Sequence, residues 1–432
     1  MARGPGAGHP LIVYNLFPTL AGPIDAWPAE ARRARDMGFT WLYVNPVHYP
    51  GFSGSLYAIK DYERLHPALV PASGQSTLDA LEPVLGEIRD VGLPTMMDLV
   101  VNHTSRDNPL VAARPGWFRR DAGGEVLSPR AVDPDDPRTV TVWGDLAEVD
   151  NEHADDREGL WAFWERLVVR GLDVGFAGFR CDAAYKVPAA LWRRLIARAR
   201  AQRPDAIFVA ETLGCTLEET QALAAAGFDY FYNSSKWWDF DAPWCLEQHE
   251  RFRHVAPSIA FPESHDTERL AAETGGREAV QRQRYAFAAF FSAGVQLTMG
   301  YEHGSRRRLD VVATRPEHRE PASLDLTDFV RRVNALKRRH PLLAGEGVLR
   351  RLDGGPDVTV LSRWSDDAGT HRGLVIVNRA WTDEREVALD LAGLRGQPRV
   401  HRPWQAEHAA GAPAPRHLRL APAEVVLVAE PG

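Results

Sequence analysis

The sequence predicts an α/β protein built on a (β/α)8 TIM barrel, with a loop domain inserted after the third strand and an all-β domain at the C-terminus. Short β-branched or aromatic runs alternate with amphipathic segments along most of the 432 residues, as they do in a parallel α/β sheet. A weakly periodic stretch, 104–150, interrupts this alternation once. The chain ends in short alternating runs separated by turn residues, which is typical of a small β-domain.

Eight strand candidates carry the barrel prediction. Each is a short apolar run, and in order they are 11–16, 41–46, 94–101, 176–181, 206–211, 228–232, 257–262 and 295–300. Amphipathic segments separate them, at 25–37, 77–91, 157–172, 188–202, 216–226 and 279–292. Eight such units suit a closed barrel. The competing open, doubly wound sheet would place a Gly-rich phosphate loop after its first strand, and no such loop follows residue 16.

The remaining segments define two further domains. Residues 104–150 are rich in Pro, Asp, Gly and Arg, and long loops of this kind in compact folds are usually functional. We assign them to an inserted domain and 1–103 with 151–342 to the barrel. Alternating runs then predict a C-terminal β-sandwich domain over 343–432; they are 357–364, 373–380, 386–391 and 424–430.

Charge and composition limit the partners. Hydrophobic residues make up 44% and charged residues 25%, which is typical of folded globular proteins. The net charge of -7 gives no support for a nucleic-acid or anionic-membrane partner. No apolar stretch is long enough to span a bilayer, and the N-terminus lacks the features of a secretory signal. Three cysteines without metal-ligand spacing, Cys181, Cys215 and Cys245, fit a reducing compartment. We therefore expect a cytoplasmic protein.

Acidic residues gather where the predicted strands end. Asp98 lies in the third strand, while Asp182, Glu211 and Asp266 follow the fourth, fifth and seventh. A single carboxylate at such a place is explained by a helix cap or an ion pair. Four of them converge on one mouth of the barrel, because the carboxyl ends of all its strands face the same way, and active sites of such barrels lie there.

The neighbours of two carboxylates predict different protonation states. Arg180 and Asp182 are two residues apart on a strand and so project to one face, where the guanidinium favours the ionised form of the acid. Asp98 on the next strand would brace Arg180 from its other side. Glu211 follows an apolar run, and desolvation raises the pKa of a carboxyl there, as a general acid requires. Cleavage of a glycosidic bond uses such a division of labour.

These segments resemble the conserved regions of the α-amylase family (glycoside hydrolase family 13). The matching segments are YAIKDY (57–62), DLVVNH (98–103), WGDLAEVDNE (143–152), GFRCDAAYK (178–186), VAE (209–211) and FPESHD (261–266). The resemblance runs from about residue 10 into the C-terminal domain. It implies that Asp182 is the catalytic nucleophile, Glu211 the general acid and base, and Asp266 the residue that holds and distorts the substrate sugar.

The resemblance implies further roles around this triad. Tyr57 would stack under the reacting sugar with Asp61 near the rim of the site, and His103, Arg180 and His265 would complete the sugar subsite. Asp98 and Asn102 would be structural residues beside it. Asn102 matches a calcium ligand of many family members, but Tyr185-Lys186 replaces the Lys-His whose carbonyl also binds that ion. The inserted domain does not supply the six or more oxygens that calcium needs, so we expect no cofactor.

The triad leaves the acceptor of the glycosyl group open. We place first an enzyme that hydrolyses or transglycosylates α-1,4-glucosidic bonds of maltooligosaccharides, with an α-glucan or maltooligosaccharide as its partner. The alternative is a maltosyltransferase that extends α-1,4-glucan from maltose 1-phosphate. Segments similar to bacterial enzymes of that kind favour it; they are 105–126, 180–192, 204–211 and 223–232.

Two observations weigh on these alternatives. Lys186 could contact a sugar phosphate, whereas an exposed lysine at the start of a helix is an equally good explanation of it. The long N-terminal domains of those transferases do not precede the barrel in this sequence. A non-catalytic carbohydrate-binding homologue is the least favoured hypothesis, because such proteins usually lose a triad residue.

Overall fold

The computed structural model describes residues 10–132, 138–405 and 411–431. Eight parallel strands close into a barrel, with each strand hydrogen-bonded to its two neighbours in the order β1-β14-β13-β12-β11-β10-β5-β2. The strands are β1 (Ile12–Leu16), β2 (Trp41–Val44), β5 (Thr95–Leu99), β10 (Gly178–Cys181), β11 (Ile207–Ala210), β12 (Tyr230–Tyr232), β13 (Ser258–Ala260) and β14 (Gly294–Thr298). Seven lie within a predicted run and β14 begins one residue before its run, and the predicted fold class is confirmed.

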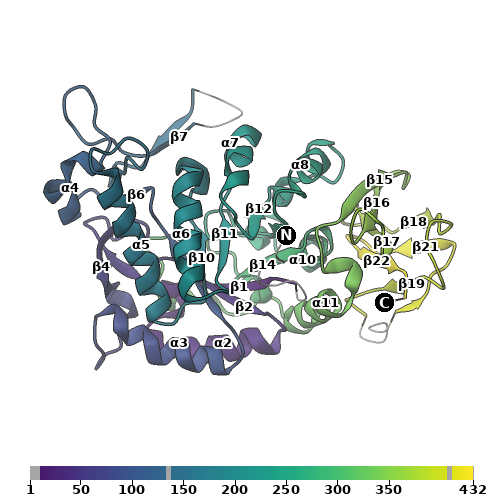
Figure 1. Cartoon of the computed structure of the whole chain (residues 1–432). Coiled ribbons are helices and arrows are strands. Elements are labelled where there is room, and N and C mark those ends of the chain that lie inside the picture. Colours follow the sequence, from purple (N-terminus) through teal and green to yellow (C-terminus); the bar gives the residue numbers. More distant parts are fainter. Residues whose placement is uncertain (1–9, 133–137, 406–410, 432) are drawn as a thin grey trace.

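Helices cover the outside of the barrel (Figure 1). The longer ones are α2 (Trp27–Asp36), α3 (Leu81–Asp90), α5 (Arg157–Asp173), α6 (Ala189–Gln202), α7 (Leu217–Ala222), α8 (Trp244–Phe252), α10 (Glu278–Phe291) and α11 (Thr327–Arg339). Short helices α1 (Pro18–Ala21), α4 (Pro109–Ala113) and α9 (Leu270–Glu273) accompany them. Local sequence sets several starts: Asp156 accepts the Gly159 N–H before α5, and Thr216 forms a capping box with Glu219 before α7. Helix α8 was not predicted.

The inside of the barrel is a packed core. Apolar side chains from several strands fill it, as TIM barrels require; they include Leu11, Val13, Tyr43, Met96, Ile207, Val209, Tyr232, Ile259 and Phe261. A second and much larger core lies between the strands and the surrounding helices. Because the interior is filled below, polar residues of the strands are displayed only at the carboxyl ends.

Two insertions rise beside the mouth of the barrel. The hairpin of β3 (His48–Pro50) and β4 (Ile59–Leu65) follows β2. After β5, strand β6 (His103–Ser105) pairs with β9 (Leu146–Glu148), and β7 (Arg130–Val132) pairs with β8 (Val140–Val142). The β7–β8 hairpin projects away from the body of the molecule (Figure 1). The segment 104–150 therefore contains short antiparallel strands that its weak periodicity did not predict.

The C-terminal region packs a β-sheet against the barrel. Its main sheet has the order β15-β16-β17-β22-β19-β20, and β18 pairs with β21 beside it. These strands are β15 (Val348–Leu352), β16 (Val358–Trp364), β17 (Arg372–Asn378), β18 (Arg385–Ala388), β19 (Arg399–His401), β20 (Ala412–Pro413), β21 (His417–Leu420) and β22 (Val425–Ala429). Alternate residues face opposite ways: Val375 and Leu427 join the core shared with the barrel, while Ile376 and Val428 pack with Leu418.

Within the described ranges, we find no helix long and apolar enough to cross a membrane.

Candidate active site

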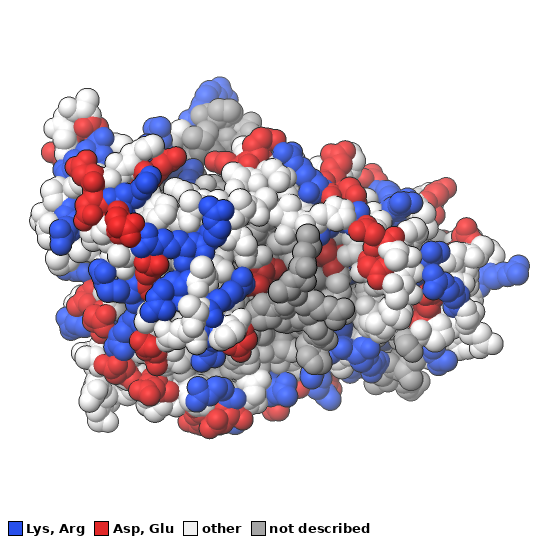
Figure 2. All heavy atoms as spheres, viewed as in Figure 1, with Lys and Arg blue, Asp and Glu red and all other residues white. Residues whose placement is uncertain are grey.

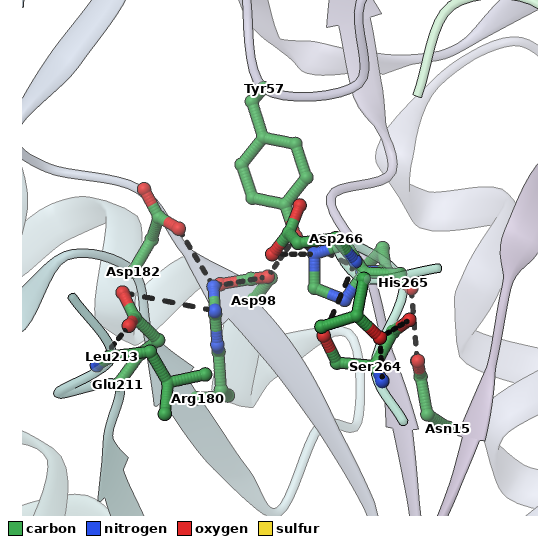
Figure 3. A network of polar contacts seen from close by, with 12 residues as sticks. Asn15, Tyr57, Asp98, Arg180, Asp182, Glu211, Leu213, Ser264, His265 and Asp266 are labelled. Carbon is green, nitrogen blue, oxygen red and sulfur yellow. Dashed lines mark hydrogen bonds and ion pairs between the residues drawn. The ribbon is translucent and has the colours of Figure 1, made fainter. Parts of the chain in front are cut away.

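The predicted carboxylates meet at the mouth of the barrel (Figure 3). Asp98 comes from β5 and Arg180 from β10, while Asp182, Glu211 and Asp266 lie just beyond the ends of β10, β11 and β13. Pairing in register places Arg180 opposite Asp98 on one neighbouring strand and Val209 on the other. The strand-end prediction therefore brings residues that are far apart in sequence into one cluster.

Arg180 is the centre of this cluster. Its Nη1 donates to Asp182 Oδ1 at 2.7 Å and to the two oxygens of Asp98 at 3.0 and 2.9 Å, and its Nη2 lies 3.9 Å from Glu211 Oε2. Only 5% of the Arg180 side chain is exposed. Because a buried cation needs paired acids, Arg180 fixes where the acidic side chains sit.

Asp98 accepts hydrogen bonds from several protein groups and holds them in place. It accepts hydrogen bonds from the hydroxyls of Tyr43 and Tyr57 at 2.6 and 2.7 Å, besides those from Arg180. Burial raises the pKa of Asp98, while the charge of Arg180 and the two tyrosines act against that rise. The Asp98 side chain is completely buried, so Asp98 holds Arg180 and Tyr57 in place and does not face a substrate.

Glu211 has the environment of a proton donor. Its side chain is 10% exposed, and burial, together with the charge of Asp182, raises its pKa to about 7 against the opposing effect of Arg180. The predicted rise in this pKa is confirmed. Backbone N–H groups of Ala183 and Leu213 donate to its two oxygens at 2.9 and 2.5 Å. These bonds orient the carboxyl toward the cleft.

The backbone at Ala183 makes one of those bonds possible. Ala183 has φ 42° and ψ 48°, a left-handed conformation that costs a non-glycine residue about 1–3 kcal/mol. The turn directs the N–H of Ala183 to Glu211 immediately after Asp182. The chain therefore stores local strain at the point where the two carboxylates are brought together.

Asp266 sits in a contrasting environment. Its side chain is 62% exposed to the cleft, and His265 Nε2 lies 3.1 Å from its Oδ2. The surrounding protein opposes its charge, but His265, Arg180 and Arg308 outweigh this effect and hold the pKa of Asp266 at about 2. Asp266 is therefore anionic across the physiological range and open to a ligand.

Tyr57 connects the two sides of the cluster. Its ring stacks on the His265 ring at 5.6 Å with only 5° between the planes, and its hydroxyl is 2.7 Å from His265 Nε2. The same hydroxyl donates to Asp98 and accepts from Asn45. Tyr57 therefore positions His265 as well as presenting an aromatic surface, a role that the sequence did not predict.

His103 lies beside the cluster with unused nitrogens. It is buried, and neither ring nitrogen has a hydrogen-bond partner in the described part of the chain. Burial lowers its pKa, and the nearby charge of Asp182 acts against that effect. A histidine that served only the core would have partners for those nitrogens. This arrangement favours the predicted contact with substrate.

Two predicted residues lie away from the carboxylates. Asp61 is on β4, accepts the Glu63 N–H at 2.9 Å, and lines a separate surface groove with Tyr49 and Phe163. Lys186 is exposed at the end of a short 3-10 turn, Ala184–Lys186, with its ammonium 5.2 Å above the Tyr185 ring. Within the described residues, no hydrogen bond or ion pair joins either side chain to Asp182, Glu211 or Asp266.

Several oxygens around Asn102 already accept protein hydrogen bonds. The backbone oxygens of Val101 and Asn102 accept from Asn151 and Val149, and Asn151 Oδ1 accepts from Trp164. In the described ranges no group of three or more His, Cys, Asp or Glu side chains is arranged to hold a metal.

A cavity of about 260 Å³ opens among these residues. Its lining includes several inward residues of the strands that sequence reasoning missed, namely Tyr43, Tyr232, Phe261 and Gln296. Tyr232 donates to Gln296 across the barrel. Their strand positions were readable, since inward residues alternate along a strand, but which of them reach the mouth depends on strand tilt.

Comparisons with known proteins agree with this geometry. Residues 9–118 match the family model described as "Glycogen debranching enzyme, glucanotransferase domain". The chain is 31% identical over 408 residues to an α-1,4-glucan:maltose-1-phosphate maltosyltransferase of Burkholderia pseudomallei, covering 90% of this chain and 35% of that protein. It is 27% identical to maltosyltransferase 1 of Streptomyces coelicolor, covering 88% of this chain and 60% of that one. The chain thus spans less than two thirds of either relative.

Solved structures share the whole fold. An α-amylase from Lactobacillus plantarum superposes with a TM-score of 0.76 at 19% identity, covering 97% of this chain and 98% of that one. At this level of identity the likeness concerns the fold alone. The likeness extends over the barrel, the inserted segment and the C-terminal sheet.

Proposed function

We propose that this chain, which belongs to the α-amylase family, is a retaining α-1,4-glucan-active enzyme that transfers maltosyl units to a glucan acceptor. Maltose 1-phosphate is the donor we favour. The observation that carries the proposal is similarity to maltosyltransferases along 90% of the chain, combined with a complete set of carboxylates at the barrel mouth. This similarity reverses the order expected from the sequence, in which hydrolysis or general transglycosylation came first.

In the first half of the reaction, an oxygen of Asp182 forms a bond to the anomeric carbon of the donor. The bond from that carbon to the leaving oxygen breaks, and the leaving oxygen takes the proton of Glu211. Arg180, 2.7 Å from Asp182, holds the nucleophile in place by an ion pair. The product of this half is a β-glycosyl-enzyme and a released phosphate.

In the second half, Glu211 acts as a base. Its carboxylate takes the proton of an acceptor hydroxyl, whose oxygen attacks the anomeric carbon and displaces Asp182. Two inversions give net retention of the α-linkage. A pKa of about 7 for Glu211 suits a group that must both give and take a proton at neutral pH.

Asp266, His265 and His103 would bind the sugar in both halves. An anionic Asp266 accepts hydrogen bonds from sugar hydroxyls, and these bonds strengthen as the ring gains positive charge in the oxocarbenium-like transition state. His265, held by Tyr57 and Asp266, lies on the same side. The unused ring nitrogens of His103 are available to other hydroxyls of that sugar.

One assay separates this proposal from hydrolysis. Purified protein is incubated with maltooligosaccharides, with and without maltose 1-phosphate. We expect release of inorganic phosphate matched by chain lengthening in steps of two glucose units. Asp182→Asn is the control, and it should remove both signals while the far-ultraviolet circular dichroism stays the same. Shortened chains and free maltose with no use of the phosphate donor would overturn the proposal in favour of an amylase.

Hydrolysis is the second candidate, because the same carboxylate pair can pass the glycosyl group to water as well as to a sugar hydroxyl. A non-catalytic carbohydrate-binding role is opposed by the chemistry of the site, since a binding protein has no use for a carboxyl whose pKa is raised to about 7.

A further inference from the structure

A second cavity, of about 580 Å³, lies beside the mouth of the barrel. It is enclosed by α1, by the residue before α9, by the end of β14 and by the segment 303–320 that follows β14. None of its lining residues lines the cavity at the carboxylates. It is a separate site with no part in the mechanism described above.

Arginines dominate this lining. Five guanidinium groups face the cavity against one carboxylate, Glu320; the arginines are Arg33, Arg269, Arg307, Arg308 and Arg319. Four of the five have ion-pair partners that are not part of the lining, and these partners are Glu30, Glu263, Glu268 and Glu302. The acids that balance these arginines therefore lie outside the lining, and the charged side chains of the lining itself are mainly cationic.

Glu320, the one acid of the lining, already has protein donors. Its Oε2 accepts the backbone N–H groups of Arg306 and Arg307, each at 2.7 Å. These bonds hold the segment after β14 in shape. They also leave this carboxylate with less hydrogen-bond acceptor capacity for the neighbouring guanidinium groups.

Several donors at the cavity are unused. Arg269 is 1% exposed, and its Nε has no hydrogen-bond partner within the described residues; the same holds for Nδ1 of the lining residue His303. The Arg307 side chain makes no ion pair in that part of the chain. Buried donors without partners are costly. Because Arg269 Nε and His303 Nδ1 are buried, the free donor among the described residues that a ligand with acceptor oxygens would reach is the exposed guanidinium of Arg307.

We propose that this cavity binds a phosphoryl group, either as inorganic phosphate or as the phosphate of a sugar ester. A guanidinium matches the geometry of phosphate oxygens and forms paired, charge-assisted hydrogen bonds with them. The enclosed part of the cavity measures about 100 Å³, which suits the phosphoryl group itself. An organic substituent on the phosphate would extend into the open part of the cavity.

Arg308 links this cavity to the catalytic cleft. Besides its ion pair with Glu268 it donates to the backbone oxygen of Asp266 at 3.1 Å. A phosphoryl group bound in the cavity would therefore share a residue with the loop that carries Asp266. The binding proposal stands on its own, however, and does not depend on the proposed maltosyl transfer.

The test measures binding by titration calorimetry in the Asp182→Asn protein, so that no turnover interferes. Inorganic phosphate, maltose 1-phosphate and maltose are titrated separately. Arg307→Gln is the test variant, because Arg307 is exposed and outside the catalytic cluster. Its matched control is Arg198→Gln on α6, where exposed arginines gather on the face seen in Figure 2. Melting temperatures establish that both variants are folded.

We expect Arg307→Gln to raise the Kd for phosphate about tenfold, the effect of one charge-assisted hydrogen bond, while Arg198→Gln leaves it unchanged. Saturating maltooligosaccharide should not displace the phosphate. If only the ester binds in an Arg307-dependent way, the phosphoryl group belongs to a sugar. If maltooligosaccharide displaces the phosphate and Arg307→Gln leaves its Kd unchanged, the phosphate binds in the catalytic cleft. That result overturns the proposal. Absence of binding of both phosphates at about 10 mM overturns it as well.

Discussion

The two sides of the barrel mouth place the same functional group in opposite conditions. On the β10–β11 side, Glu211 is 10% exposed, held by two backbone N–H groups, and has a pKa raised to about 7. On the β13 side, Asp266 is 62% exposed beside His265, and its pKa is about 2. The charge of Arg180 acts to lower the pKa of both carboxyls. Burial raises the pKa of both carboxyls, but at Asp266 it is outweighed by His265 and two arginines, whereas at Glu211 burial and the charge of Asp182 outweigh Arg180.

The largest expected effect is that of replacing Glu211, and its size depends on the leaving group of the donor. For a donor whose leaving oxygen needs a proton, Glu211→Gln should lower kcat/KM about 10²–10⁴-fold, which is the usual contribution of a general acid. The loss of the first step should be small with an α-glycosyl fluoride, because fluoride leaves without protonation. Burst-phase kinetics with both donors measure this difference.

Asp266→Asn is the matched variant for that experiment. Its loss should be similar for both donors, because Asp266 acts on the sugar and not on the leaving group. Equal losses in the Glu211→Gln protein for the two donors would contradict the assignment of Glu211 as the acid.

The pH dependence gives a smaller and independent effect. Glu211 must be protonated for the first half of the reaction, and its pKa is raised from its ordinary value to about 7. The active form is therefore present below pH 7, and kcat/KM should fall about tenfold per pH unit well above it. The low pKa of Asp266 keeps that residue ionised throughout this range.

Two variants decide whether this falling limb belongs to Glu211. In Asp266→Asn the limb should remain but move to lower pH, because the charge of Asp266 contributes to the raised pKa of Glu211. In Glu211→Gln the residual activity should lose the limb. A limb that stays in place in Glu211→Gln would assign the titration to another group.

Much of this contrast was predictable from the sequence, and the reasons are local. Arg180 and Asp182 share a strand face because side chains alternate along a strand, and the apolar run before Glu211 indicated its desolvation. The closed barrel followed from eight alternating units. These inferences needed only periodicity and the rule that parallel strands end at one edge.

Other features depend on the assembled structure. No periodicity predicts that Ala183 adopts φ 42° or that its N–H reaches Glu211. Tyr57 was expected under the sugar, but its stacking on His265 depends on how the β3–β4 hairpin folds over the mouth. Helix α8, which begins just after Pro243, was not predicted. The arginine cavity brings together segments separated by up to about 300 residues of chain, beyond any pattern in one segment.

The smallest expected effect concerns Trp237, an exposed tryptophan beside the catalytic cavity. Trp237, at the end of the 3-10 turn Ser235–Trp237, is 52% exposed, and its ring meets Phe261 edge to face at 6.1 Å. Phe261 lines the catalytic cavity, so Trp237 offers an aromatic surface to a longer glucan at its edge.

Trp237→Ala should raise KM for long maltooligosaccharides about two- to tenfold, the value of one aromatic contact, with kcat nearly unchanged. Trp381→Ala is the matched control, because Trp381 is 39% exposed but lies in the C-terminal region beneath Arg277. Initial rates on maltose and on chains of six or more glucose units separate the two tryptophans, since a contact beyond the catalytic subsite affects only the long chains. Equal effects of the two variants would place the aromatic contact outside the cleft. A drop in kcat for Trp237→Ala would mean that Trp237 supports Phe261 and, through it, the reacting sugar.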